Sequence, residues 1–146
     1  MPQEINRADQ AAHRFLQLFR YLRKHAREIN SQGISPPQYA VLRYIAENDS
    51  ATVGQIQEYL YKSPSTTSTL IAKLEAAGHV TRTRSKKDNR VVHVELTESG
   101  GMLVENTPLG GITLLREQLK TLPEERLTRI DEALSDLMTL MDVQED

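Results

Sequence analysis

Apolar residues recur at intervals of three or four positions along most of this 146-residue chain, which predicts a mainly helical protein. Two stretches after residue 79 instead alternate apolar and polar residues in part, as paired strands do. The pattern predicts six helices and one small β-hairpin. The expected helices cover residues 6–30, 35–48, 52–61, 63–78, 97–120 and 121 onward, and the hairpin covers Val80–Ser85 and Val91–Leu96.

Several expected helices begin with a side chain that can bond free backbone amides. Three of them have a capping box, in which a hydroxyl residue is followed three positions later by Gln or Glu. These boxes are Ser35–Gln38, Thr52–Gln55 and Thr121–Glu124. Ser63 and Thr97 mark two further starts. In the fifth helix, Pro108 and the pair Gly110-Gly111 predict a kink or a short break, because both residue types weaken a helix interior.

The helix over residues 63–78 has an unusual polar face. Its apolar positions are Thr67, Leu70, Ile71 and Leu74. Hydroxyl residues fall largely on the other side, at Ser65, Thr66, Ser68 and Thr69. A surface helix normally carries Glu, Lys and Gln, which are better helix formers. Short hydroxyl side chains can reach the phosphates and base edges of a duplex, although a plain solvated face is the alternative.

The hairpin that follows is basic. Between Val80 and His93 there are five Lys or Arg residues and one Asp, a net charge of +4 in a chain whose formal net charge is −2. A local basic cluster on a mildly acidic protein is typical of a surface that binds polyanions. The alternative is a soluble sheet edge, since lysines also prevent strands from aggregating. Two short helices followed by this hairpin form the arrangement of a winged helix-turn-helix.

Two linked motifs resemble those of a known family. Asp88 to Gly100 fits D-x-R-x5-L-T-x-x-G, and Leu74 to Arg82 fits L-E-x-x-G-hydrophobic-V-x-R, with His79 where an aliphatic residue is usual. The chain is therefore similar to the MarR family of bacterial winged helix-turn-helix transcriptional regulators. This resemblance implies a homodimer with intertwined terminal helices that binds a pseudo-palindromic operator, often as a repressor. It also implies release from DNA by a small ligand.

This resemblance and the charge pattern suggest how one chain, residues 1–146, is organised. Residues 1–34 and 101–146 are expected to form a helical dimerisation region, and residues 35–100 a winged helix-turn-helix region. The first helix has a net charge of +4 between Ala11 and Asn30, and residues 117–146 have a net charge of −6. These opposite charges favour contact between terminal helices of two subunits. The alternative is that both helix faces are solvated within one chain.

Double-stranded DNA is the expected partner of the winged region. The helix over residues 63–78 is expected to enter the major groove and the wing to lie along the backbone, with Arg90 reaching a minor groove as the resemblance implies. Asp88 is expected either to orient Arg90 or to pair with Arg82 or Arg84. The predicted DNA-binding residues are Ser63, Ser65, Thr66, Ser68, Thr69, Lys73, Arg82, Arg84, Lys86, Lys87, Asp88 and Arg90.

An effector site is the second expectation. The resemblance implies a pocket between the dimer helices and the winged region, which takes small aromatic acids. Candidate lining residues are His13, Arg20, Tyr39 and Arg43. An Arg could bind a carboxylate through two parallel hydrogen bonds. The alternatives are a core position for Tyr39 and either solvated positions or surface ion pairs for Arg20 and Arg43. Because Arg20, Arg23, Lys24 and Arg27 are clustered, an acyl-coenzyme A thioester is a second possible ligand.

Composition narrows the other classes of function. There is no Cys, which excludes disulfides, thiolate catalysis and cysteine redox sensing. The four His residues are scattered without metal-ligand spacing, and neither a P-loop, a G-x-S-x-G motif nor a dinucleotide loop occurs. We therefore expect no metal, no cofactor and no enzymatic activity. Since the chain has neither a signal peptide nor a membrane-span-length apolar run, we expect a cytoplasmic protein. A helical protein-interaction module that does not bind DNA is the alternative.

Overall fold

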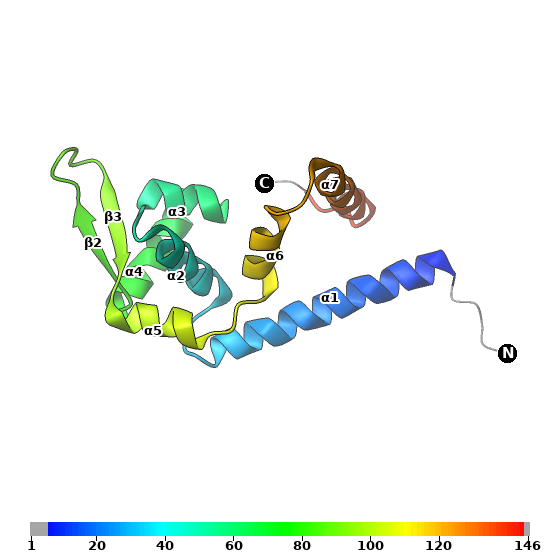
Figure 1. The fold of residues 1–146 in the computed structure, drawn as a ribbon, viewed down its shortest axis with the longest axis horizontal. Coiled ribbons are helices and arrows are strands. Elements are labelled where there is room, and N and C mark those ends of the chain that lie inside the picture. The colour runs from blue at the N-terminus through cyan, green and yellow to red at the C-terminus, as the bar shows by residue number, and fades with distance from the viewer. Residues whose placement is uncertain (1–5, 145–146) are drawn as a thin grey trace. The chain divides into compact units, whose positions relative to one another are not determined.

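The computed structural model describes residues 6–144, which form two compact units that divide between Gly111 and Ile112. The first unit contains five helices and a small sheet (Figure 1). Its helices are α1 (Arg7–Asn30), α2 (Pro36–Asn48), α3 (Val53–Leu60), α4 (Pro64–Ala76) and α5 (Glu98–Asn106). Its strands are β1 (Ala51–Thr52), β2 (Val80–Arg84) and β3 (Val92–Leu96). The second unit contains α6 (Gly111–Leu119) and α7 (Glu124–Leu140).

Helix α2 lies at the centre of the first unit. It packs against α1, α3, α4, α5 and the sheet, and its buried residues are Tyr39, Val41, Leu42 and Ile45. The same core takes Ile56 from α3, Ile71 and Leu74 from α4, and Val94 from β3. Each of these elements is short, so burial against α2 is what stabilises it. The core thereby holds α3, α4 and the sheet in one arrangement.

The predicted helix starts are confirmed for α2, α3, α4 and α5. Ser35 and Thr52 each form a complete capping box with the Gln three residues later. The Ser63 side chain accepts from the Thr66 amide, and the Thr97 side chain accepts from the Gly100 amide. Local side-chain chemistry therefore determines where these four helices begin.

The sheet has one strand more than expected. Strands β2 and β3 form the predicted antiparallel hairpin, in which Val80 pairs with Leu96 and Arg84 with Val92. The two-residue strand β1 pairs with the other side of β3, with Ala51 opposite Val94. The sheet therefore has the order β1-β3-β2, and β1 fixes the start of α3 beside the middle of β3.

Two predictions about the C-terminal helices are wrong in detail. The described chain has seven helices, not six, because the expected break at Pro108 and Gly110 separates α5 from α6 completely. Thr121 does not cap α7: Pro123 is the N-cap residue, and the Thr121 hydroxyl donates to the Gln118 carbonyl at 2.7 Å. A residue that precedes a proline disfavours helical geometry, so Leu122 is a poor first helical residue.

The start of α5 is tightly joined to the turn between α4 and β2. The Thr97 hydroxyl donates to the Gly78 carbonyl at 2.6 Å, and the Thr97 amide donates to the His79 carbonyl at 3.1 Å. A Cβ atom on Gly100 would collide with that His79 carbonyl oxygen. Glycine is therefore required at position 100. The hydrogen bonds from Thr97 fix the start of α5 to the turn that leads into the wing.

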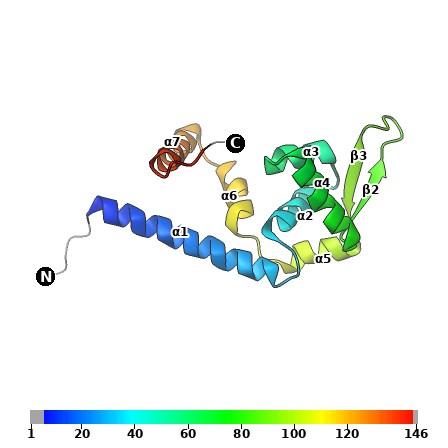
Figure 2. The same cartoon turned by 180° about the vertical axis from the view of Figure 1, so that it is seen from behind.

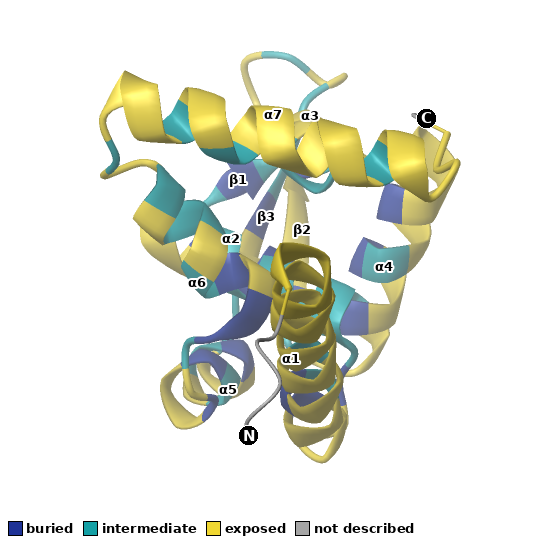
Figure 3. Ribbon diagram, turned by 90° about the vertical axis from the view of Figure 1, so that its right-hand side faces the viewer, coloured by how far each residue is buried: buried dark blue, intermediate teal, exposed yellow. Residues whose placement is uncertain are grey.

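Helices α1 and α7 are exposed along most of their length (Figure 3), and both carry large apolar residues that are exposed. On α1 only His25 and Ile29 are buried, whereas Phe15, Leu16, Leu18 and Phe19 are exposed. Within the described chain none of the residues of α7 is buried, and Leu134, Leu137 and Leu140 are exposed. Among residues 6–144, no helix has the length and apolar character of a membrane span.

Candidate nucleic-acid interface

Helix α4 has one buried face and one open face. Thr67, Ile71 and Leu74 are fully buried against the core, as the sequence predicts. The hydroxyl residues Ser65, Thr66, Ser68 and Thr69 are exposed, and so is Lys73. The core therefore fixes the rotation of the helix about its axis, and this rotation points the hydroxyl face outward.

Hydrogen bonds within α4 limit what several of these hydroxyls can do. Ser63 Oγ donates to Thr66 Oγ1 at 2.9 Å and accepts from the Thr66 amide at 3.2 Å. Thr69 Oγ1 donates to the Ser65 carbonyl at 2.9 Å. A hydroxyl whose proton is already donated can still accept. Ser63 therefore serves chiefly as a helix cap, and Thr69 can offer only its lone pairs to a partner.

Glu75 joins α4 to the wing. Arg82 Nε donates to Glu75 Oε2 at 3.1 Å, and Arg82 Nη2 donates to Glu75 Oε1 at 2.9 Å. The hydrogen bonds from Arg82 lower the pKa of Glu75, and those same bonds raise the pKa of Arg82. The charge of Arg82 is thereby balanced. An open hollow of about 430 Å³ between α4 and the wing is lined by this pair together with Arg84 and Val92.

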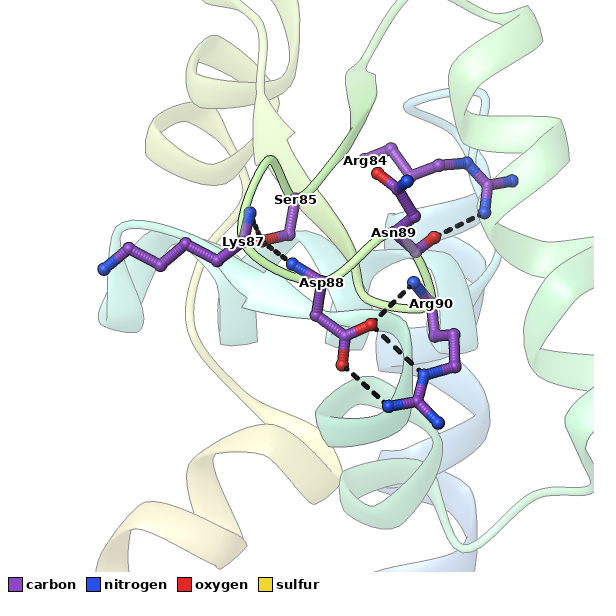
Figure 4. Close-up of polar contacts among 6 residues, drawn as sticks. All are labelled: Arg84, Ser85, Lys87, Asp88, Asn89 and Arg90. Atoms are coloured by element: carbon purple, nitrogen blue, oxygen red, sulfur yellow. Dashed lines mark hydrogen bonds and ion pairs between the residues drawn. The ribbon is translucent and has the colours of Figure 1, made fainter.

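The loop at the tip of the wing, residues 85–91, is closed by its own polar groups (Figure 4). The Ser85 amide donates to the Val91 carbonyl at 2.8 Å, and the Ser85 hydroxyl accepts from the Lys87 and Asp88 amides at 3.2 and 3.4 Å. Arg84 Nη1 donates to the Asn89 carbonyl at 2.7 Å. These bonds give the loop a defined shape, and the loop stands away from the helices (Figure 2).

Asp88 orients Arg90. Its Oδ1 accepts from the Arg90 amide at 3.0 Å and from Arg90 Nε at 3.2 Å, and its Oδ2 lies 3.5 Å from Nη2. The bond from the Arg90 amide is the main cause of the lowered pKa of Asp88, followed by the bond from the side chain. The Arg90 side chain is nevertheless 91% exposed. Of the alternatives considered for Asp88, the contact with Arg90 is the one present.

The hydroxyl face of α4 and the basic wing are therefore neighbours and form one surface, which we call the reading surface. It comprises the exposed residues of α4 between Ser63 and Lys73 and the wing residues 82–90. Sequence reasoning missed Glu75 and Ser85. The Glu of the L-E-x-x-G motif could have been matched to Arg82, but Ser85 has no comparable signal, because its role depends on the loop conformation.

The four candidate effector residues are not gathered in one place within this chain. Tyr39 is 1% exposed in the core, and Arg43 Nε donates to Glu47 at 3.1 Å. His13 and Arg20 lie on the exposed part of α1. His13 precedes Ile29, which shares the core with Tyr39, by 16 residues, or about 24 Å along the helix.

Histidines do not form a metal site in the described chain. Residues 6–144 contain no group of three or more His, Asp or Glu side chains placed to share an ion. His79 Nδ1 lies 2.8 Å from Ser99 Oγ, at the start of α5. His25 is buried next to Tyr21, whose hydroxyl accepts from the Gly111 amide at 2.9 Å. Both histidines therefore occupy structural positions between elements.

Comparison with known proteins agrees with the fold. Residues 32–90 match the family model described as the MarR family, which covers α2 to the wing tip. The organic hydroperoxide resistance transcriptional regulator of Bacillus subtilis (strain 168) is 35% identical over 77 residues, which are 53% of this chain and 52% of that protein. The chain thus spans about half the length of this relative.

Solved structures of MarR proteins have the same fold. AbsC, a MarR family transcriptional regulator from Streptomyces coelicolor, superposes with a TM-score of 0.64 at 23% identity over 97% of this chain and 99% of its own. A mutant MarR from E. coli, complexed with operator DNA, gives 0.61 at 22% identity over 88% and 91%. The winged helix-turn-helix, both sequence motifs and the family model over residues 32–90 make this chain similar to the MarR family.

Proposed function

We propose that the protein is a dimeric, sequence-specific DNA-binding transcriptional regulator that represses by occupying a pseudo-palindromic operator. The main support is the geometry of Arg90. Its side chain is 91% exposed and yet is held by Asp88 through bonds to both its backbone and its guanidinium. A cation that is both exposed and oriented is suited to a binding partner outside the chain, and narrow A·T minor grooves attract an inserted Arg.

The two parts of the reading surface have different roles in this proposal. The exposed residues of α4 lie in the major groove, where hydroxyls can bond base edges. Lys86 and Lys87 contact phosphates along the wing, and Arg84 does so where β2 meets the tip loop. Arg82 contributes less net charge than the sequence suggests, because Glu75 already balances it.

Dimerisation is supported by the exposed faces of the terminal helices. Phe15 and Phe19 on α1 are 38% and 49% exposed, and Leu134 on α7 is 50% exposed. An amphipathic helix whose apolar stripe is open to water gains stability when a second subunit covers it. The basic charge of α1 and the acidic charge of the C-terminal helices favour contact between subunits.

The relatives support the class of function. The Bacillus subtilis relative is named a transcriptional regulator, and the E. coli MarR mutant was solved with operator DNA. These properties belong to those proteins. Their bearing on this chain depends on the reading surface, which carries an oriented Arg90, an exposed hydroxyl face and two exposed lysines.

Selection of duplexes from a random pool is expected to yield a pseudo-palindrome with half-site centres about 10–10.5 base pairs apart, or a multiple of that spacing. Binding to random duplex should be weaker and should fall steeply with salt, because phosphate contacts release counterions. Substitution of Ser68 or Thr69 by Ala in the same selection should change the preferred bases at specific positions of each half-site.

The same experiment separates this proposal from the alternative of a protein-interaction module. A module of that kind would retain no duplex at low salt and would enrich no sequence. If binding is found but all substitutions on α4 reduce affinity uniformly, α4 contacts only the backbone and the assignment of its face to base reading is wrong.

We also propose that a small ligand releases the protein from DNA, and that the ligand is an aromatic carboxylate or its coenzyme A thioester. Within one chain, His13 on α1 lies far along that helix from the core that contains Tyr39 of α2. A pocket that uses both therefore requires α1 of a second subunit. For the thioester, the ligand phosphates would meet the cationic cluster Arg20, Arg23, Lys24 and Arg27.

A paired assay tests the effector proposal. A compound that binds the free form more tightly than the DNA-bound form is expected to raise the melting temperature and also to weaken operator binding. Substituting Arg20 by Gln should reduce both effects together, while Arg14→Gln on the same helix serves as the matched control. A compound that raises the melting temperature but leaves operator affinity unchanged is not the effector.

A further inference from the structure

Thr69 lies at the centre of the exposed face of α4. It comes two residues after Thr67 and two before Ile71, which are both fully buried. Because successive residues of a helix are rotated by about 100°, a residue two positions from a buried one points about 200° away from it, to the opposite side. Ala72 and Ala76, the next residues along this side of the helix, are exposed and small. A partner can therefore approach Thr69 closely.

The hydroxyl of Thr69 has a fixed direction. Its only proton is donated to the Ser65 carbonyl at 2.9 Å, one turn earlier in α4. A threonine hydroxyl has one proton and two lone pairs, and a β-branched side chain has few rotamers in a helix. The Thr69 side chain therefore offers a partner a methyl group and the lone pairs of Oγ1, which accept hydrogen bonds.

Ser68 provides the contrast on the same helix. Its side chain is exposed, and among residues 6–144 its hydroxyl makes no hydrogen bond. It comes one residue after the buried Thr67, so it lies at the edge of the exposed face and not at its centre. The Ser68 hydroxyl can donate or accept, as a partner requires. Two neighbouring hydroxyls of α4 therefore differ in whether their proton is available.

Bases differ in the groups that they present in the major groove. Adenine and cytosine present an amino group, N6 or N4, which donates hydrogen bonds, whereas guanine and thymine present a carbonyl oxygen, O6 or O4, which accepts them. To donate to such an oxygen, Thr69 would have to break its bond to Ser65, so one hydrogen bond would replace another. Accepting from an amino group adds a bond and keeps the one to Ser65. The contact with an amino group is therefore the favourable one.

We propose that Thr69 selects a base with an exocyclic amino group, adenine or cytosine, at one position of each half-site and rejects guanine and thymine there. This inference rests on the proposed DNA-binding function, in which the N-terminal part of α4 approaches the bases. Thr69 lies in the first half of α4 (Pro64–Ala76). The expected preference is about 3- to 10-fold, which corresponds to one neutral hydrogen bond.

Selection of duplexes from a random pool by the parent and three variants tests the inference. The parent is expected to enrich adenine and cytosine at one position of each half-site. Thr69→Val has almost the same shape but no lone pair, and it should lose this preference at that position only. Thr69→Ser keeps a hydroxyl that can donate to the Ser65 carbonyl, and it should retain the preference. Ser68→Ala is the matched control and should leave that position unchanged, because Ser68 lies at the edge of the face.

A base analogue identifies the atom that Thr69 contacts. In an operator with adenine at the selected position, adenine is replaced by purine, which lacks the 6-amino group. This change should weaken binding by the parent about 3- to 10-fold more than binding by Thr69→Val. A general effect of the analogue on the duplex is the same for both proteins and cancels in the comparison. Each variant is first compared with the parent by circular dichroism, and the exposed position of Thr69 keeps the substitutions out of the core.

The outcomes separate the inference from the proposed function. If Thr69→Val enriches the same sequence as the parent, Thr69 reads no base, so the inference is wrong while the DNA-binding function stands. If Thr69→Val changes a position at which the parent prefers guanine or thymine, the hydroxyl acts as a donor and the inference is also wrong. A uniform loss of affinity for all duplexes would place Thr69 against the phosphate backbone and overturn it as well. If the parent itself enriches no sequence, the proposed function fails and this inference fails with it.

Discussion

Replacing Phe15 and Phe19 on α1 together by Glu is expected to convert the protein to a monomer and to lower operator affinity by about 100-fold or more. Both side chains lie on the exposed apolar stripe of α1. Two carboxylates on that stripe would have to be desolvated in a dimer, which is strongly unfavourable. Two half-sites bound by linked modules gain about 10²- to 10⁴-fold over one, and the monomer loses this gain.

Sedimentation and operator titration of the same samples test this expectation. Gln17→Glu is the matched control, because residue 17 lies on the opposite side of α1 and the substitution adds the same type of charge. The control should remain dimeric and bind as the parent does. A double variant that is still dimeric would place the subunit contact elsewhere, and a monomer with undiminished operator affinity would contradict the two-half-site arrangement.

Arg90→Ala is expected to weaken operator binding by about 1–3 kcal/mol, or roughly 5- to 150-fold, and to relax the preference for bases near the wing. The loss is specific because Arg90 is oriented by Asp88 and contacts a shape-dependent minor groove in the proposal. Lys86→Ala and Lys87→Ala should weaken binding to all duplexes alike and should each reduce the salt slope by about 0.9.

Asp88→Asn tests how much the orientation of Arg90 by Asp88 contributes to operator affinity. It keeps an acceptor near Arg90 but removes the charge, so its operator affinity should lie between those of the parent and the Arg90 variant. Because the pKa of Asp88 is lowered, its carboxylate is fully ionised and paired with Arg90 at any pH above its ordinary pKa. The pairing is lost only as the pH falls through the lowered pKa. Operator binding by an Arg90→Ala variant at parental affinity, with the fold intact, would contradict the assignment of the wing.

The sequence predicts most strongly those features that depend on neighbouring residues. The caps at Ser35, Thr52, Ser63 and Thr97 each act within four residues, and all are present. The apolar face of α4 follows from the helical period alone. These local rules were enough to predict the order of the helices up to α5 and the rotation of α4 about its axis.

Features that depend on distant residues were missed or only partly predicted. Strand β1 has two residues and no periodicity of its own, and it exists because Ala51 lies opposite Val94. The Glu75–Arg82 pair joins two elements across a turn. Thr121 matched a capping pattern, but the proline two positions later favours a later helix start. In each case a tertiary neighbour or a steric constraint outside the pattern decides the structure.

The bonds between α4, the wing and α5 also determine which motions can switch the protein. Glu75 and Arg82 join α4 to β2, and Thr97 joins the start of α5 to the carbonyl of Gly78 in the turn between them. Bending the wing away from α4 would break these contacts, whereas a hinge rotation outside them would not. In the proposed dimer such a rotation changes the distance between the two α4 helices. An effector therefore needs only to change this distance so that it no longer fits the fixed half-site spacing of the duplex. Each reading surface can stay unchanged.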